Sequence, residues 1–294
     1  MRAVVVTEFG GPEAVEIAEV EVPEPGARQI RIKVAAAALN PVDAGVRAGG
    51  FGGAGRQLGL GWDVAGTVDA AGADAGWRVG DEVVALSYGP VKSLGAHADY
   101  VVVDADAVAG APSSVDPVHA ATLPLNALTA AQALDLLALE PGQSLAVTGA
   151  AGAVGGYAVQ LAARRGLVVT GVARERDEEF VRSLGAAHFA PGGVDGVDGV
   201  LDAAILGAAA LEWVRDGGVF VGVIPGAHPA SVRGVRTDSV AVSADGARLA
   251  ELVALVDEGV LTTRVADTYG LEEAGKAHAR LAEGGLRGRL VLIP

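Results

Sequence analysis

One glycine-rich stretch constrains the fold of this chain more than any other feature. Residues 145–161 begin as an apolar strand, break at Gly149, Gly152 and Gly155, and resume as a helical pattern. Glycines let a backbone turn tightly and approach a phosphate closely, and the start of a helix presents N–H groups and a partial positive charge to an anion. A second strand pattern at 167–172 completes a βαβ unit. The stretch therefore predicts a site for a dinucleotide pyrophosphate, built on a parallel sheet.

The composition argues against several classes of ligand. The chain has 294 residues, enough for two domains, and a net charge of −14. That charge disfavours a broad attraction to nucleic acid or to an anionic membrane, so local arginines must meet any anionic ligand. The chain has no cysteine, which excludes thiolate metal sites, and its five histidines show no paired ligand spacing. We therefore expect no metal, no nucleic acid and no membrane partner.

Two segments bear on where the protein is located. Residues 1–7 begin directly as a strand and lack the layout of a signal peptide, which predicts a cytoplasmic protein. Residues 141–163 are uncharged and long enough to span a membrane. Their glycines and polar side chains fit a buried βα unit better than a membrane helix.

The residue pattern changes near residue 115. Before it, short strands separated by Gly and Pro clusters are typical of a partly closed β-barrel. These strands are predicted at 2–7, 29–38, 63–70, 82–86 and 98–103.

After residue 115, helices alternate with strands, which is typical of a doubly wound parallel sheet covered on both faces. The helices are predicted at 119–138, 155–165, 177–184 and 247–258, and the strands at 144–148, 167–172, 199–203 and 218–223. The tail, 264–293, follows as strand, helix and strand. Its pattern does not decide whether it extends the nucleotide sheet or returns to the first domain.

Seven sequence blocks, taken in order and at their spacing, resemble the zinc-free branch of the medium-chain dehydrogenase/reductase superfamily, the quinone oxidoreductase-like enzymes. The resemblance covers nearly the whole chain. The blocks are Ala38-Leu-Asn-Pro-Val-Asp43, Gly61-Trp-Asp-Val-Ala-Gly-Thr-Val68, Val79-Gly-Asp-Glu-Val83, Gly95-Ala-His-Ala-Asp-Tyr100, Leu123-Pro-Leu-Asn-Ala-Leu-Thr-Ala130, Ala150-Ala-Gly-Ala-Val-Gly155 and Gly285-Leu-Arg-Gly-Arg-Leu-Val-Leu292.

The resemblance implies an α/β protein with two domains. A GroES-like, partly closed β-barrel catalytic domain would comprise residues 1–118 and be completed by 260–294. A Rossmann nucleotide domain would comprise residues 119–259, and the substrate would lie in the cleft between the two. A homodimer is also implied, with the strand-like residues 239–243 pairing across a two-fold axis.

The end of the second nucleotide strand indicates which dinucleotide binds. In this fold an acid there accepts the ribose hydroxyls of NAD and repels the 2′-phosphate of NADP. Here small residues stand in that place, followed by Arg174 and Arg176. An arginine can hold the phosphate in a forked, charge-assisted pair, so the pattern favours NADPH. The alternative is that both arginines are solvated residues paired with Glu175 and Asp177.

The resemblance also suggests individual site residues. Asn40 would donate its amide to a substrate carbonyl or to the nicotinamide. Tyr88 and His97 are possible proton sources by their residue type alone, since no motif supports either. Thr129 matches a position that the resemblance places close to the nicotinamide. The alternative for Asn40 is a turn-forming residue before Pro41, and the alternative for Thr129 is a hydroxyl bonded to its own helix. The expected cofactor-binding residues are Asn40, Thr129, Ala150, Gly152, Ala153, Val154, Gly155, Arg174, Arg176, Gly222 and Val223.

The function that these features predict is a metal-independent, NADPH-dependent reductase of quinones or α,β-unsaturated carbonyls. The hydride would pass from the nicotinamide C4 to an electron-poor carbon, and neutral donors would stabilise the developing oxyanion. One alternative is an enoyl reductase that acts on a thioester or polyketide intermediate. Another is a nucleotide-binding sensor without turnover, because fold and cofactor site do not guarantee catalysis.

Overall fold

The computed structural model describes residues 1–294 and divides into two compact units. The first unit comprises Met1–Leu125, Ser243–Gly259 and Thr263–Pro294, and the second comprises Asn126–Val242 and Val260–Thr262. None of its helices combines the length and the apolar character needed to cross a bilayer. The domain limits predicted above, 1–118 with 260–294 and 119–259, stay a prediction.

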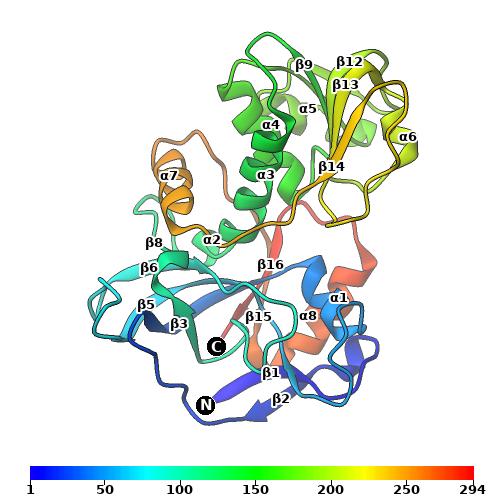
Figure 1. The fold of residues 1–294 in the computed structure, drawn as a ribbon. Helices are drawn as coiled ribbons and strands as arrows, with labels where there is room; N and C mark the ends of the chain where they lie inside the picture. Colours follow the sequence, from blue (N-terminus) through cyan, green and yellow to red (C-terminus); the bar gives the residue numbers. More distant parts are fainter. The chain divides into compact units, whose positions relative to one another are not determined.

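Two sheets form the framework of the first unit (Figure 1). The larger has the order β15-β16-β3-β5-β6-β8, with β7 also paired to β3, and the smaller has the order β2-β1-β4. All neighbours are antiparallel except β15 and β16. The strands are β1 (Arg2–Val6), β2 (Glu16–Glu19), β3 (Gln29–Leu39), β4 (Leu58–Gly59), β5 (Asp63–Ala71), β6 (Glu82–Leu86), β7 (Tyr100–Asp104), β8 (Val108–Gly110), β15 (Val265–Gly270) and β16 (Arg289–Ile293).

Helices complete the first unit. They are α1 (Pro41–Arg47), α2 (Pro117–Ala120), α7 (Gly246–Asp257) and α8 (Ala274–Glu283), with short 3₁₀ turns that include η1 (Pro12–Ala14), η2 (Ala105–Ala107) and η4 (Leu271–Glu273). The chain's tail belongs to this unit, because β16 pairs with β3 and places Leu290 opposite Leu39. This pairing decides the alternative that the sequence pattern left open.

The burial pattern of β3 explains why it forms the centre of the first unit. Ile30, Ile32 and Val34 are buried, whereas Arg31 and Lys33 between them point outward. This alternation has the period of a strand with one face in the core. The buried side chains pack into one cluster with apolar residues of β5, β6 and β7.

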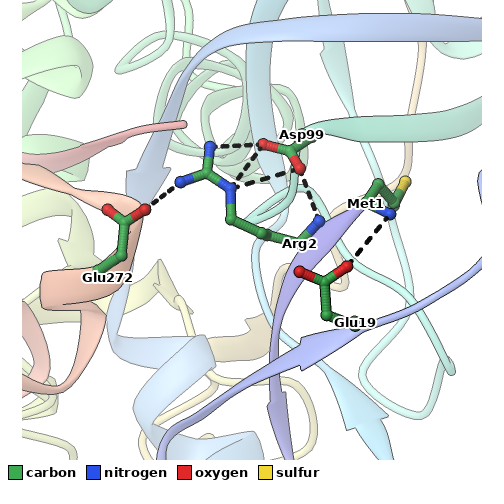
Figure 2. A network of polar contacts seen from close by, with 5 residues as sticks. All are labelled: Met1, Arg2, Glu19, Asp99 and Glu272. Carbon is green, nitrogen blue, oxygen red and sulfur yellow. Dashed lines mark hydrogen bonds and ion pairs between the residues drawn. The ribbon is translucent and has the colours of Figure 1, made fainter.

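Arg2 anchors the N-terminal strand by side-chain contacts (Figure 2). Its Nη2 donates to Asp99 Oδ1 at 2.7 Å, its backbone N–H donates to Asp99 Oδ2 at 2.6 Å, and its Nη1 forms an ion pair with Glu272. The guanidinium thus joins β1 to the residue before β7 and to η4. Close by, the terminal ammonium of Met1 donates to the carbonyl oxygen of Val20 at 2.8 Å and lies 3.9 Å from Glu19.

The second unit is built on one parallel sheet of six strands (Figure 1). Its order, β11-β10-β9-β12-β13-β14, is the doubly wound order that reverses direction between β9 and β12. Its strands are β9 (Ser144–Thr148), β10 (Val168–Val172), β11 (His188–Ala190), β12 (Val197–Asp202), β13 (Val214–Gly222) and β14 (Arg236–Ser239). Its helices are α3 (Pro124–Leu137), which begins at the boundary of the units, α4 (Ala153–Arg164), α5 (Glu178–Ser183) and α6 (Ala208–Leu211), with η3 (Glu175–Asp177) before α5.

Three sequence expectations need correction. The single helix predicted at 119–138 is two helices, α2 and α3, because a proline at position 124 disfavours the helical conformation of the residue before it. The helix expected from residue 155 begins at Ala153, with Gly152 as its N-cap. The strand expected at 239–243 is β14, which ends at Ser239.

Candidate functional site

The glycine turn of the second unit lies between β9 and α4. Gly149 has a φ of +59°, a conformation that favours glycine. Gly152 is the N-cap of α4, and a Cβ on Gly155 would lie 2.2 Å from the carbonyl oxygen of Gly149. The turn therefore requires glycine at position 155. Since the first N–H groups of a helix have no partner within it, this cradle fits the pyrophosphate of a dinucleotide.

The remaining residues of the turn are small and mostly enclosed. Ala150 is fully buried, and its N–H donates to the carbonyl oxygen of Val172 at 3.2 Å, which holds the turn against the end of β10. Ala153 is buried as well, whereas Val154 is half-buried in the first turn of α4. Small side chains here leave the backbone accessible to a phosphate.

The sheet register brings the ends of four strands together. Thr148 of β9 is opposite Val172 of β10 on one side and Asp202 of β12 on the other, and Asp202 is opposite Gly222 of β13. The Thr148 hydroxyl donates to Asp202 Oδ1 at 2.6 Å across the point where the strand order reverses. Ligands of doubly wound sheets bind outside this edge.

Asp202 serves the backbone of the loop that follows it. Its Oδ2 accepts from the Gly207 N–H at 2.8 Å and its Oδ1 from the Leu206 N–H at 3.1 Å, and its side chain is buried. The carboxylate therefore fixes the 203–207 loop at the same edge of the sheet.

Arg174 lies two residues beyond β10 at this edge. Its side chain is exposed and makes no hydrogen bond or ion pair. Arg174 therefore does not form the pairing with Glu175 or Asp177 that the alternative interpretation required. Arg182 of α5 differs, because its Nε donates to Glu178 Oε1 at 2.8 Å. Arg176, in η3, is also exposed.

Three other predicted cofactor residues also belong to the elements around this sheet. Gly222 is buried at the end of β13, where its carbonyl oxygen accepts from the Val240 N–H at 2.9 Å, and Val223 follows it. Thr129 is buried within α3. The structure thus brings the turn, Arg174 and Val223 to one edge of the sheet, and their roles in cofactor binding stay predictions.

Asn40 belongs to a buried polar cluster in the first unit, formed with Asp43 and Asp63. Its Nδ2 donates to Asp63 Oδ2 at 2.7 Å and to the carbonyl oxygen of Ala38 at 3.4 Å, and the residue is fully buried. Asp43 accepts from the Asn40 N–H and from the Gly61 N–H, each at 2.8 Å. This geometry favours the alternative role of Asn40 as a structural residue at the start of α1.

Asp63 is the carboxylate of this cluster with a strongly displaced pKa. Burial raises its pKa to about 7, and repulsion from Asp43 acts in the same direction. Hydrogen bonds from the Leu125 N–H, at 2.6 Å, and from Asn40 oppose this rise by favouring the charged form. The carboxyl can therefore change its charge near neutral pH.

Tyr88 forms an aromatic edge with Trp62, the residue before Asp63. The two rings are 5.1 Å apart between centroids and meet edge to face. Trp62 is buried, whereas Tyr88 is 54% exposed. The Lys92 Nζ lies 5.6 Å from the centroid of the Trp62 ring and donates to the Ser87 Oγ at 3.0 Å.

Lys92 and Asp63 are functional candidates that the sequence pattern did not predict. Asp63 belongs to the Gly61–Val68 block, but nothing in that block marks it as a chemically active group, and the loop that carries Lys92 has no regular pattern. One signal was present, since the chain has only three lysines, Lys33, Lys92 and Lys276, and Lys92 stands shortly before the Gly95 block.

Comparison with known proteins places the chain in a family. The family model described as alcohol dehydrogenase GroES-like domain matches residues 26–113, and that described as zinc-binding dehydrogenase matches residues 170–292. The NADPH-dependent alkenal/one oxidoreductase of Arabidopsis thaliana is 32% identical over 310 residues, 96% of this chain and 78% of the relative. This chain belongs to the medium-chain dehydrogenase/reductase superfamily, in its quinone oxidoreductase-like branch.

Solved structures of this superfamily share the fold of the whole chain. The quinone oxidoreductase from Coxiella burnetii has a TM-score of 0.88 at 27% identity and covers 100% of this chain and 99% of its own. A mycobacterial protein complexed with NADPH has a TM-score of 0.85 at 25% identity, over 100% of both chains. The GroES-like and Rossmann architecture predicted from the sequence is confirmed.

One of the family descriptions refers to zinc. Where the zinc-dependent members have ligands, the resemblance places Asn40 and the segment that contains Asp63. No group of three or more His, Cys, Asp or Glu side chains is arranged to hold a metal ion. A metal-independent reaction stays a prediction.

Proposed function

We propose that this protein is an NADPH-dependent reductase of quinones or α,β-unsaturated carbonyls. One observation carries the proposal: a glycine cradle and an unpaired arginine share the carboxyl edge of a doubly wound sheet. The name of the Arabidopsis relative supports NADPH and enones, and that of the Coxiella structure supports quinones. When bound, NADPH supplies a hydride from its nicotinamide C4.

The chain's own residues would bind and orient the cofactor. The N–H groups of residues 153–155 would hold the pyrophosphate at the start of α4, where the helix dipole favours an anion. The Arg174 guanidinium would pair with the 2′-phosphate, because the end of β10 carries no acid that would repel it. Gly222 and Val223 would contact the cofactor beyond the end of β13.

A matched pair of variants tests the role of Arg174. In Arg174→Ala, the ratio of kcat/KM with NADPH to kcat/KM with NADH should fall about ten- to a hundred-fold, because a hydrogen bond to a charged group contributes roughly 1.5–3 kcal/mol. Arg182→Ala, which removes an exposed arginine already paired with Glu178, is the control and should leave the ratio unchanged. An unchanged ratio in Arg174→Ala contradicts the assignment.

The substrate class is tested with the unmodified protein. NADPH consumption should be measured with 1,4-benzoquinone and with 3-buten-2-one, each against a reaction without acceptor. Turnover with at least one of them is the expected result. Tight NADPH binding without turnover on any quinone or enone would instead favour the nucleotide-binding sensor.

We also propose that the protein is a homodimer. Strand β14 pairs only with β13, so its other edge presents unpaired backbone groups to a second strand. Sedimentation equilibrium should give twice the chain mass of 29.2 kDa. A mass of one chain at every concentration contradicts this proposal. The cytoplasmic location stays a prediction.

A further inference from the structure

Lys92 differs from the other two lysines of the chain. Lys33 is exposed on β3, and Lys276 is exposed with its Nζ 2.9 Å from Glu273 Oε1. Lys92 is half-buried and has no carboxylate oxygen within 4.0 Å of its Nζ. Withdrawing an ammonium from water without a carboxylate partner is unfavourable, so such a lysine is more typical of a functional site than of a purely structural one.

The position of Lys92 is fixed by its side chain and by its backbone. The ammonium donates to the carbonyl oxygen and to the hydroxyl of Ser87, which accounts for two of its three hydrogens. The Lys92 carbonyl oxygen accepts from the Gly59 N–H at 2.8 Å. A Cβ on Gly59 would lie 2.4 Å from the backbone nitrogen of Gly95, so the two segments are in close contact. The third hydrogen of the ammonium is thus held in place without a partner in the protein.

The surroundings of Lys92 prepare its proton for transfer. Burial lowers the pKa of Lys92 to about 8, while attraction to Asp43 and Asp63 acts in the opposite direction and keeps the ammonium protonated at neutral pH. His97, which also interacts with Lys92, has a lowered pKa because of its burial and is therefore neutral. A group with a pKa close to the working pH is well suited to general acid catalysis.

The aromatic edge of Trp62 and Tyr88 offers a surface for a conjugated substrate beside this ammonium. The Trp62 ring lies next to the Lys92 Nζ, and the more exposed Tyr88 ring meets it edge to face. Quinones and enones are flat and polarisable, and they pack well against aromatic rings.

We propose that Lys92 is the proton donor of the reduction, with its third N–H directed at the substrate carbonyl oxygen. As a hydride forms a C–H bond at the β carbon, the C=C electron pair moves toward the carbonyl and the C=O π pair moves onto oxygen. That oxygen takes the Nζ proton and becomes the hydroxyl of an enol, and neutral Lys92 is reprotonated by water. The enol then tautomerises to the saturated ketone. This inference rests on the proposed function.

Two substitutions separate proton donation from charge. Lys92→Met, which keeps the length of the side chain, should lower kcat for 3-buten-2-one about a hundred-fold, the typical contribution of a general acid. Lys92→Arg keeps the positive charge but holds its proton too tightly to transfer it, so it should not restore kcat. Lys276→Met is the matched control and should retain full activity. Full rescue by arginine would overturn proton donation.

The dependence of kcat on pH distinguishes proton donation by Lys92 from a purely structural role, which would leave that dependence unchanged. In the unmodified protein, kcat should fall above about pH 8, because deprotonated Lys92 has no proton to give. Lys92→Met should lose this alkaline limb, while its NADPH dissociation constant, measured by fluorescence, stays within two-fold. An unchanged kcat and an unchanged limb in Lys92→Met would overturn the proposal.

A measurement on the unmodified protein does not depend on turnover or on a variant's folding. With isotope-labelled lysine, NMR should show three side-chain signals, one of which titrates near pH 8. The same signal should shift when the ketone product, 2-butanone, is added in the presence of NADP. Three ordinary titrations near the usual lysine pKa would overturn the role of Lys92. An absence of turnover with every quinone and enone, by contrast, would overturn the proposed function itself.

Discussion

The glycine turn of the second unit and the polar cluster of the first unit differ in which groups form them, backbone in one and side chains in the other. The turn consists of backbone, since Gly149, Gly152 and Gly155 contribute no side chains and act through their conformation and close approach. The polar cluster consists of side chains, and the hydrogen bonds of Asp63 join residues far apart in the chain, Asn40 and Leu125. A site built from backbone therefore shows in the local sequence, whereas a site built from side chains depends on tertiary contacts.

The largest effect is expected from breaking the backbone site. In Gly155→Ala, the new Cβ would lie 2.2 Å from the Gly149 carbonyl oxygen, so the turn must open. NADPH affinity, measured by fluorescence titration, should fall by at least about a hundred-fold, because the N–H groups of the turn lose their alignment to the pyrophosphate.

A second glycine supplies the control for this variant. Gly192 has no neighbour within 4 Å of an added Cβ and no positive φ, so Gly192→Ala should leave affinity unchanged. If the two sites are structurally independent, the titration of Lys92 should also be the same in Gly155→Ala as in the unmodified protein. Normal NADPH affinity in Gly155→Ala contradicts the close packing described for this turn.

The same difference between local and tertiary contacts decided which elements of the fold could be predicted from the sequence. The strand from Ser144 to Thr148 and the turn after it follow from local chemistry, and their prediction was correct to within two residues. Short elements such as β4 and α6 were not predicted, because so few residues show no periodicity and form through pairing or packing.

The candidate site divides in the same way. Arg174 follows its strand directly, so its position at the sheet edge could be predicted from spacing. Lys92 acquires its properties from Trp62, Ser87 and the carboxylates of the cluster, which no spacing in the sequence reveals. The roles of Asn40 and Tyr88 stay predictions.

Acid should expose a second difference between the two regions, because a buried histidine lies in the first unit. The Nδ1 of His278 is 3.2 Å from Arg47 Nη1, and since a guanidinium only donates, the imidazole must accept and be neutral. Burial, with the positive charge of Arg47 beside it, lowers the pKa of His278 to about 3. Since its pKa is higher in the unfolded chain, its contribution to stability is lost as the pH falls below about 6.5.

The variant His278→Gln isolates this contribution. Between pH 7 and pH 5, the free energy of unfolding of the unmodified protein should fall by about 2 kcal/mol relative to that of the variant, as measured by urea unfolding. Asp63 acts in the opposite direction, because its raised pKa favours folding as the pH falls, but this effect is common to both proteins. His188→Gln, at an exposed position, is the control, and its free energy of unfolding relative to the unmodified protein should be the same at both pH values. If His278→Gln also kept the same relative free energy of unfolding at both pH values, the lowered pKa of His278 would be contradicted.

The smallest effect is expected from the surface network of Arg2 (Figure 2). In Arg2→Met, the pairs with Asp99 and Glu272 are lost, and the free energy of unfolding should fall by about 1 kcal/mol, since partly exposed ion pairs contribute little. NADPH affinity should not change, because this network belongs to the first unit only. A loss of NADPH affinity without unfolding would show that the two regions are coupled.

Hydride transfer to carbon is the central step of the proposed reaction, and isotope labelling tests it directly. The protein should be incubated with 3-buten-2-one and NADPH deuterated at either face of C4, and the product analysed by mass spectrometry and NMR. We expect 2-butanone with one deuterium at the former β carbon from one of the two labelled cofactors. Hydride transfer to carbon would be contradicted if neither labelled cofactor gave a deuterated product. It would also be contradicted if NADPH bound but no enone or quinone gave a product.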